Sequence, residues 1–188
     1  RFNSKKWINP GFLHGPYLPL YGFGLALLFL IARIPLGGIS GGTQSILSYN
    51  YGARQFGRVR DAQKKIFRLC MGFTAIMFVL ARAAGPLFVR LFTKDAQVAE
   101  ISAWAIRVCT LAAIPLGAQY EIVDGFTALG QVRLSFPLSF FRKAVYFAAL
   151  FILPACFGAR AAFYAEPVSD VLGPLASAIA YKLCIGPV

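Results

Sequence analysis

The chain has 188 residues, of which 58% are hydrophobic and 14% are charged, and its mean hydropathy is +0.64. Soluble domains are about one quarter charged, so this composition excludes a water-soluble enzyme and indicates an all-α membrane protein. Since a helix needs roughly 20 residues to cross a bilayer, the length allows a polytopic bundle of five to six transmembrane helices.

The net charge of +12 does not indicate a nucleic-acid partner, because the basic residues lie between apolar segments and not on one soluble face. Six of them crowd one predicted connector: Arg54, Arg58, Arg60, Lys64, Lys65 and Arg68. The positive-inside rule places this connector in the cytoplasm, and the remaining Lys and Arg place the C-terminus on the same side. The cysteines are scattered singly, so no metal site or redox pair is predicted.

The first apolar segment leaves two structures open. Residues 17–32 are almost wholly apolar, whereas residues 34–51 are small and polar. One structure is a helix from about Leu20 to Tyr51 kinked at Pro35, and the other is a hairpin that turns near residues 33–35. Local geometry favours the kinked helix, because each hairpin arm would be short for a span and membrane helices tolerate Pro. The charge distribution favours the hairpin, which places the basic N-terminus inside.

Four further helices are predicted along the rest of the chain. An apolar stretch with Arg82 near its middle is followed by a helix for which Asp95 is the expected N-cap. A short break near residues 128–131 separates that helix from the next. The predicted helices are Leu69 to Phe92, Ala96 to about Asp124 through Pro115, Arg133 to about Cys156, and Ala161 to Lys182.

Charged residues within the apolar segments are the candidate functional groups, since ionisable groups at membrane depth usually face a bundle interior or a wet cavity. Glu121 and Asp124 are three residues apart, so they share a helical face and could together bind a cation or carry a proton. The alternative is that both lie near the inner interface and are simply solvated. The full set is Arg82, Arg107, Glu121, Asp124, Arg142, Lys143 and Asp170.

A Gly/Ser-rich helix that ends in Tyr-Asn-Tyr-Gly-Ala-Arg resembles the multidrug and toxin extrusion (MATE) family of efflux transporters, in which such a motif closes the second helix of the C-terminal lobe. The matching residues are Gly38, Gly41, Gln44, Tyr49, Asn50, Tyr51, Gly52 and Ala53. Further matches follow in the family's order: Leu91-Phe92, Ala105-Ile106-Arg107, Pro115, Gly117, Gly125-Phe126, Ala128-Leu129-Gly130, Arg142, Pro154, Pro167 and Asp170.

The resemblance covers residues 34–188 and implies a partial MATE-like lobe in the inner membrane of a bacterium. It implies efflux of small organic cations or drugs by antiport with Na⁺ or H⁺, with no other cofactor and no enzymatic activity. Gln44, Arg142 and Asp170 fall on the family pattern and become candidate substrate or cation sites beside Glu121 and Asp124. Arg142 and Asp170 are expected to face each other, for transport or as a structural ion pair.

Residues 1–33 resemble a different group, the ABC-transporter-type membrane permeases of bacteria, through the motif from Asn9 to Gly24. The chain is therefore expected to divide into an N-terminal segment of different origin, residues 1–33, and the MATE-like helices, residues 34–188. Two rival functions follow: a truncated or fused membrane protein that does not transport, and a permease subunit of ABC type. Transport would require the missing N-terminal lobe or a second copy of the chain.

Overall fold

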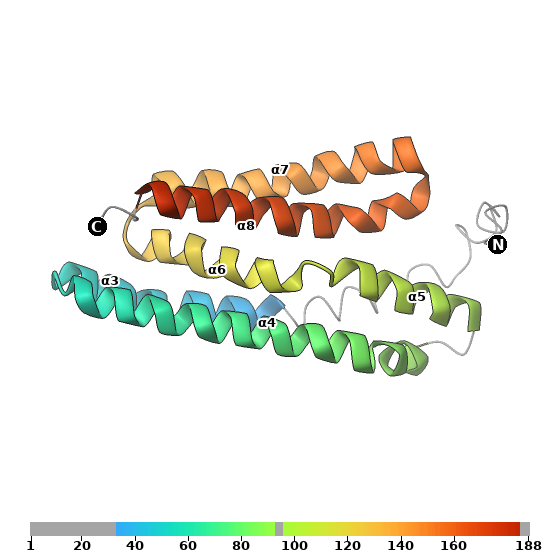
Figure 1. Ribbon diagram of the computed structural model, residues 1–188, viewed down its shortest axis with the longest axis horizontal. Helices are drawn as coiled ribbons and strands as arrows, with labels where there is room; N and C mark the ends of the chain where they lie inside the picture. The colour runs from blue at the N-terminus through green and yellow to red at the C-terminus, as the bar shows by residue number, and fades with distance from the viewer. Residues whose placement is uncertain (1–32, 93–95, 185–188) are drawn as a thin grey trace.

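The computed structural model describes residues 33–92 and 96–184, and these residues form a bundle of helices (Figure 1). Residues 33–42 are helical and lead into the first labelled helix. The labelled elements are α3 (Gln44–Gly52), α4 (Phe56–Phe92), α5 (Ala96–Cys109), α6 (Ala113–Ala128), α7 (Val132–Phe157), the 3₁₀ helix η2 (Ala159–Tyr164) and α8 (Ala165–Cys184). The predicted all-α fold is confirmed.

Helix α6 lies at the centre of the bundle. Figure 1 shows α3 and α4 on one side of it and the antiparallel pair α7 and α8 on the other, and α6 contacts all four helices. Its buried residues are correspondingly numerous and include Leu116, Gln119, Glu121 and Phe126. Polar side chains on α6 therefore face protein on two sides.

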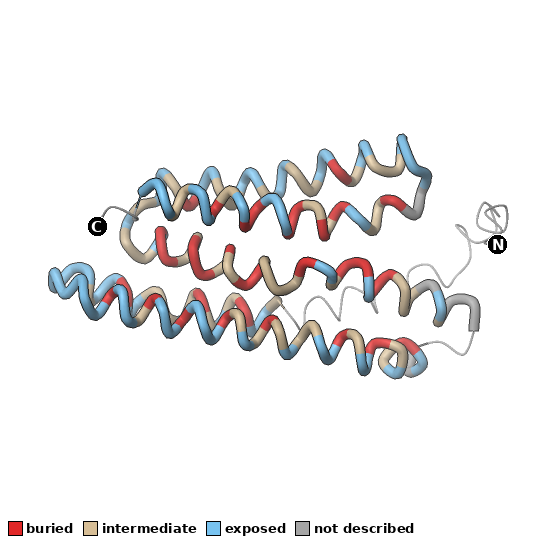
Figure 2. Tube along the Cα trace, in the orientation of Figure 1, coloured by how far each residue is buried: buried red, intermediate tan, exposed pale blue. Residues whose placement is uncertain are grey.

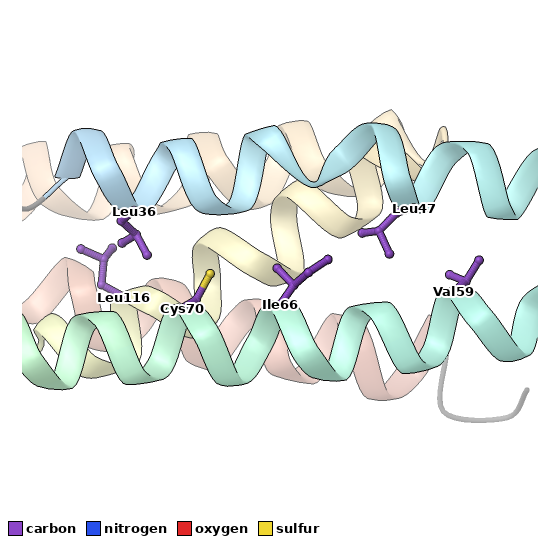
Figure 3. Close-up of a cluster of buried hydrophobic side chains, with 6 residues drawn as sticks. All are labelled: Leu36, Leu47, Val59, Ile66, Cys70 and Leu116. Carbon is purple, nitrogen blue, oxygen red and sulfur yellow. The ribbon is translucent and has the colours of Figure 1, made fainter.

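A hydrophobic cluster joins α4 to α6 and to residues 33–52 (Figure 3). Its α4 members are Val59, Ile66 and Cys70, which are spaced seven and four residues apart and so share one face of a helix. Leu36, Leu47 and Leu116 complete the cluster from the neighbouring helices. This apolar face explains why α4 begins at Phe56. The prediction of a connector over residues 54–68 was wrong, since the basic residues occupy the outer faces of an amphipathic helix.

A second correction concerns the helix that was predicted to run from Ala96 to Asp124. The structure divides it into α5 and α6, which are bent by 45° across residues 110–112. Pro115 has no backbone N–H to donate to the carbonyl of Leu111, and its ring crowds that carbonyl, which favours a break in the preceding turn. The predicted break near residues 128–131 is confirmed, because α6 ends at Ala128 and α7 begins at Val132.

The helical segment before α3 passes through Pro35 and breaks at Thr43. The Thr43 hydroxyl donates to the carbonyls of Ile39 and Ser40, and such back-bonding competes with the helix at a point already weakened by Gly41 and Gly42. The choice between a hairpin and a kinked helix depends on residues 17–32. These residues, like Asp95, lie outside those that the structure describes.

Within the part of the chain that the structure describes, two helices are long and apolar enough to cross a membrane, Phe56–Arg90 and Val132–Phe157. Helices α5 and α6 make a third span if the bent pair crosses as one. Figure 2 shows that the outward faces of the helices are largely exposed, and many of the exposed residues are large and apolar. On α7 they are Val132, Phe136, Phe140, Phe141, Phe147, Phe151, Ile152 and Phe157. A surface of this kind is stable against lipid.

The connections divide between the two ends of the bundle. The turn between α3 and α4, the turn between α6 and α7, and the end of α8 lie at one end, and the α7–α8 connection lies at the other (Figure 1). The basic start of α4 and the end of α8 therefore lie at the same end of the bundle, as a shared side of the membrane requires. That this side is the cytoplasm stays a prediction.

Candidate functional site

Four charged side chains from three helical segments form one buried network. The Asp170 carboxylate on α8 accepts a hydrogen bond from Arg142 on α7 at 3.1 Å and pairs with Arg33 at 3.5 Å. Arg33 also pairs with Glu166, one turn before Asp170 on α8. Asp170 is only 2% exposed, so its charge depends on these arginines. The predicted juxtaposition of Arg142 and Asp170 is present.

Local sequence explains why the network needs partners from other helices. Glu166 and Asp170 are four residues apart, so two like charges share one face of α8 and repel each other. The only basic residue of α8 is Lys182, in its last turn. Arg33 and Arg142 supply two positive charges against two negative ones, which leaves the network neutral overall. Arg33 and Glu166 were not predicted as site residues, although a carboxylate pair of this spacing on an apolar helix calls for cations nearby.

An apolar cavity of about 240 Å³ adjoins the network. It opens between α4, α5 and α6, and Arg33 and Asp170 form its charged edge. The apolar lining includes Phe73, Met77, Leu80, Ala81, Phe88, Ile106 and Leu116. Such a space suits a compound with an apolar body and a positive charge, because the body displaces no polar contact and the charge can approach a carboxylate.

A second cavity of about 220 Å³ lies between α6 and α7 and is polar. Its lining includes Asp124, Ser139, Arg142 and Lys143. Arg142 lines this polar cavity, whereas its partner Asp170 lines the apolar one. The Arg142–Asp170 ion pair therefore stands between the two cavities.

Gly173 makes room for that ion pair. A Cβ placed on Gly173 would lie 2.9 Å from Cγ and 3.0 Å from Cδ of Arg142, and 2.5 Å from Oε1 of Gln119. Real Cβ atoms do not approach so closely, so any side chain here would push the Arg142 stem or the Gln119 amide aside. The Oε1 atom of Gln119 is buried and has no hydrogen-bond partner among the described residues, which leaves an acceptor beside the polar cavity.

Glu121 and Asp124 form a second acidic group on α6. Glu121 is 3% exposed, so the alternative of a carboxylate simply solvated at the interface is wrong for it. The amide of Gln63 on α4 lies beside it, and the Gln63 Oε1 atom accepts a hydrogen bond from the Tyr181 hydroxyl at 3.5 Å. Among the described residues, the Oε1 atom of Glu121 has no hydrogen-bond partner. Asp124 is half-buried, and the polar side chains of Ser40 and Gln44 lie near it. Among the described residues neither carboxylate has an ion pair within 4 Å.

The remaining predicted intramembrane charges lie apart from these groups. Arg82 stands over the ring of Phe78, with 4.8 Å between the guanidinium carbon and the ring centroid, and it donates to the backbone carbonyl of Arg107 at 3.3 Å. The cation–π contact is internal to α4, whereas the hydrogen bond to the Arg107 carbonyl links α4 to α5. Arg107 itself is exposed, and Lys143 lines the polar cavity.

Apolar outer faces, long spanning helices and charged groups held inside the bundle define an integral membrane protein of the transporter class. A sequence model of the family described as MatE matches residues 18–151. The chain belongs to this family, whose members are transporters. The match begins within the segment that resembles ABC-type permeases, and a boundary near residue 33 stays a prediction.

Relatives and solved structures agree with this family. The chain is 23% identical over 168 residues to the multidrug export protein MepA of Staphylococcus aureus strain MSSA476, which covers 86% of this chain and 37% of the relative. MepA of strain COL is 25% identical over 172 residues, with the same coverage of both chains. The chain thus spans little more than a third of the length of these relatives.

Two MATE transporter structures share the fold. The multidrug transporter DinF-BH, solved as a complex, matches with a TM-score of 0.80 and 27% identity, over 86% of this chain and 37% of that one. A mutant of the Vibrio cholerae MATE transporter VcmN matches with a TM-score of 0.80 and 16% identity, over 93% of this chain and 40% of that one. The described helices therefore have the arrangement of part of a MATE transporter.

Proposed function

We propose that the chain is part of a multidrug efflux transporter of the inner membrane and that its apolar cavity binds a small organic cation. The observation that carries this proposal is the buried carboxylate of Asp170 at the edge of an otherwise apolar space. The relatives reported above are named as multidrug export proteins, which supports the proposal. An organic cation would place its apolar body among the α4 side chains and its charge toward Asp170.

Binding of a cation requires an exchange of partners. Arg33 and Arg142 already neutralise Asp170, so an incoming cation competes with them for the carboxylate. Arg142 is the partner that can leave, because it also lines the polar cavity and its guanidinium can turn into that space. The affinity for cations is therefore limited by the strength of the Arg142–Asp170 pair.

Antiport with H⁺ or Na⁺ would need a second group that changes its charge or its ligand. Glu121 and Asp124 are the residues proposed for this step, since their partners among the described residues are neutral and no arginine holds them in one state. Amide and hydroxyl groups surround both carboxylates, with Gln44 among those near Asp124. A proton or a Na⁺ ion could add to this acidic group without breaking an ion pair.

Expressed alone, the chain should insert into the membrane but should not transport. Alternating access requires one bundle to move against another, and this chain spans 37% of the length of its relatives. A missing lobe or a second copy would have to complete the pathway. The rival function, a fused or truncated membrane protein without transport, predicts insertion and no cation binding. Ethidium efflux from vesicles that contain only this chain, with and without a Na⁺ or H⁺ gradient, tests the first expectation.

Binding of a fluorescent rhodamine cation to the purified chain in detergent, followed by fluorescence polarisation, tests the cavity. Asp170→Asn should weaken binding at least about tenfold, which equals about 1.4 kcal/mol. Arg142→Gln should strengthen it, because the carboxylate then has one competitor fewer. Asp61→Asn makes the same chemical change on an exposed part of α4 and should leave binding unchanged. If Arg142→Gln and Asp170→Asn weaken binding equally, the substitutions disturb the fold and the proposed site is wrong.

A further inference from the structure

An open groove of about 540 Å³ lies between α3 and α4, outside the cavities already described. From α3 it is lined by Ile46 and Asn50, and from α4 by Arg58, Asp61, Ala62, Lys65 and Ile66. Ile66 is buried at its floor and Ile46 is half exposed at its side. The groove therefore combines an apolar base with a charged rim.

Three charged residues of the rim follow one another along one face of α4. Arg58, Asp61 and Lys65 are spaced three and four residues apart, so their side chains project from successive turns toward the same side. All three are exposed, and among the described residues none forms an ion pair within 4 Å. The rim thus presents two unpaired cations on either side of one carboxylate.

The groove lies where lipid headgroups are expected. It adjoins the α3–α4 turn at one end of the bundle, where α4 changes from basic residues to the apolar stretch that begins at Leu69 (Figure 1). Basic pockets at this depth between transmembrane helices recognise phosphate headgroups. The two cations stand about 10 Å apart along the helix axis, so long side chains can converge on one phosphate between them.

We propose that the α3–α4 groove binds the headgroup of an anionic phospholipid, phosphatidylglycerol, with its phosphate between Arg58 and Lys65. The glycerol hydroxyls donate to the Asp61 carboxylate, and the apolar base contacts the start of the acyl chains. This site is independent of the proposed transport function, because it shares no residue with either cavity.

The charge of the groove selects this headgroup among common lipids. Arg58, Lys65 and Asp61 sum to one positive charge, which one phosphodiester neutralises. A phosphatidylethanolamine headgroup is neutral overall and leaves that charge unbalanced. Phosphatidic acid carries more negative charge and no hydroxyl donor beyond its phosphate, so Asp61 repels it. The carboxylate therefore acts as a selectivity element within a basic surface.

The test measures lipid binding to the full chain in detergent by native mass spectrometry, with short-chain phosphatidylglycerol, phosphatidylethanolamine, phosphatidic acid and inorganic phosphate as separate probes. The double variant Arg58→Gln/Lys65→Gln should weaken phosphatidylglycerol binding about 30-fold, or about fivefold for each cation. The matched control Arg54→Gln/Lys64→Gln removes the same charge from exposed positions outside the groove and should change binding less than about twofold.

Asp61→Asn provides a second, independent readout. Removing the carboxylate should raise the affinity for phosphatidic acid about fivefold and change that for phosphatidylglycerol less, so the preference between the two lipids falls. Equal losses in the two double variants would show a general electrostatic surface and overturn the proposal. Inorganic phosphate binding as tightly as the lipid, or phosphatidylethanolamine binding more tightly than phosphatidylglycerol, would also overturn it.

Discussion

Two acidic groups inside the same bundle differ in how their negative charges are balanced. Glu166 and Asp170 on α8 are held by Arg33 and Arg142, so each carboxylate has a cationic partner. Glu121 and Asp124 on α6 have neutral polar neighbours from α4 and from residues 40–44, and no ion pair among the described residues. We call the α8 network closed, because each of its carboxylates is paired with an arginine, and the α6 group open, because its carboxylates have no cationic partner among the described residues.

The difference has an energetic consequence. In the α8 network each charge is paired with its opposite and Asp170 is buried, so removing one member leaves the others uncompensated. In the α6 group a carboxylate can be replaced by an amide while its neutral neighbours keep a hydrogen-bond partner. Substitutions in the α8 network should therefore lower the free energy of unfolding more than substitutions in the α6 group.

The largest effect is expected for Asp170→Asn. Removing this charge leaves Arg33 and Arg142 partly buried without a full counter-charge, and breaking a buried pair in this way costs about 3–5 kcal/mol. The free energy of unfolding of the purified chain, measured by denaturant titration in detergent micelles, checks the value. Arg142→Gln combined with Asp170→Asn should recover part of the loss, since one positive and one negative charge then leave together. A double variant as unstable as the sum of the single ones would contradict the paired network.

Gly173→Ala should have the next largest effect. The new methyl group would lie 2.5 Å from Gln119 Oε1 and 2.9 Å from Arg142 Cγ, and overpacking of this kind typically costs about 1–3 kcal/mol. The matched control is Gly72→Ala on α4, where a Cβ meets nothing within 4 Å and the substitution should stabilise the helix by about 0.5–1 kcal/mol. Opposite signs in the same unfolding assay are expected. Equal effects would mean that Gly173 does not position the arginine.

These two predictions also show what the sequence could and could not provide. Apolar runs along the chain predicted most of the helices, and a spacing of three residues predicted the shared face of Glu121 and Asp124, because both are local features of the sequence. The start of α4 and the break between α5 and α6 were predicted wrongly. The family pattern pointed to Arg142 and Asp170. Arg33 and Glu166 were missed, since a network of four charges is assembled by tertiary packing between residues 133 apart in the chain. The role of Gly173 was not predicted either, because it depends on the path of the Arg142 side chain.

The open acidic group should respond weakly to the corresponding change. Glu121→Gln removes a buried carboxylate that has no cation beside it among the described residues, and an amide can still bond to Gln63. The free energy of unfolding should fall by less than about 1 kcal/mol or rise, in contrast to Asp170→Asn. A loss of several kcal/mol for Glu121→Gln would show that an unrecognised cation holds this group and would remove the difference between the two networks.

The smallest perturbation, labelling of native thiols, tells which side of the membrane each network approaches. Cys156 and Cys184 are exposed near opposite ends of the bundle, whereas Cys70 and Cys109 are buried. With the basic end in the cytoplasm, a membrane-impermeant maleimide added to intact cells should label Cys156 but not Cys184. Permeabilised cells should show both labels, and Cys156→Ser should remove the first.

That labelling pattern would show which of the two acidic groups lies nearer the cytoplasm. Asp124 lies in the last turns of α6, toward the end that carries Cys184, whereas Glu166 and Asp170 lie in the first turns of α8, toward the end near Cys156. Labelling of Cys156 alone would place the open acidic group nearer the cytoplasm and the closed network nearer the outside. A coupling ion that enters from outside would then meet the closed network first. To reach Asp124 through the polar cavity, it would have to pass the Arg142–Asp170 pair. Labelling of Cys184 alone would reverse this order and make the open group the first to meet an ion from outside.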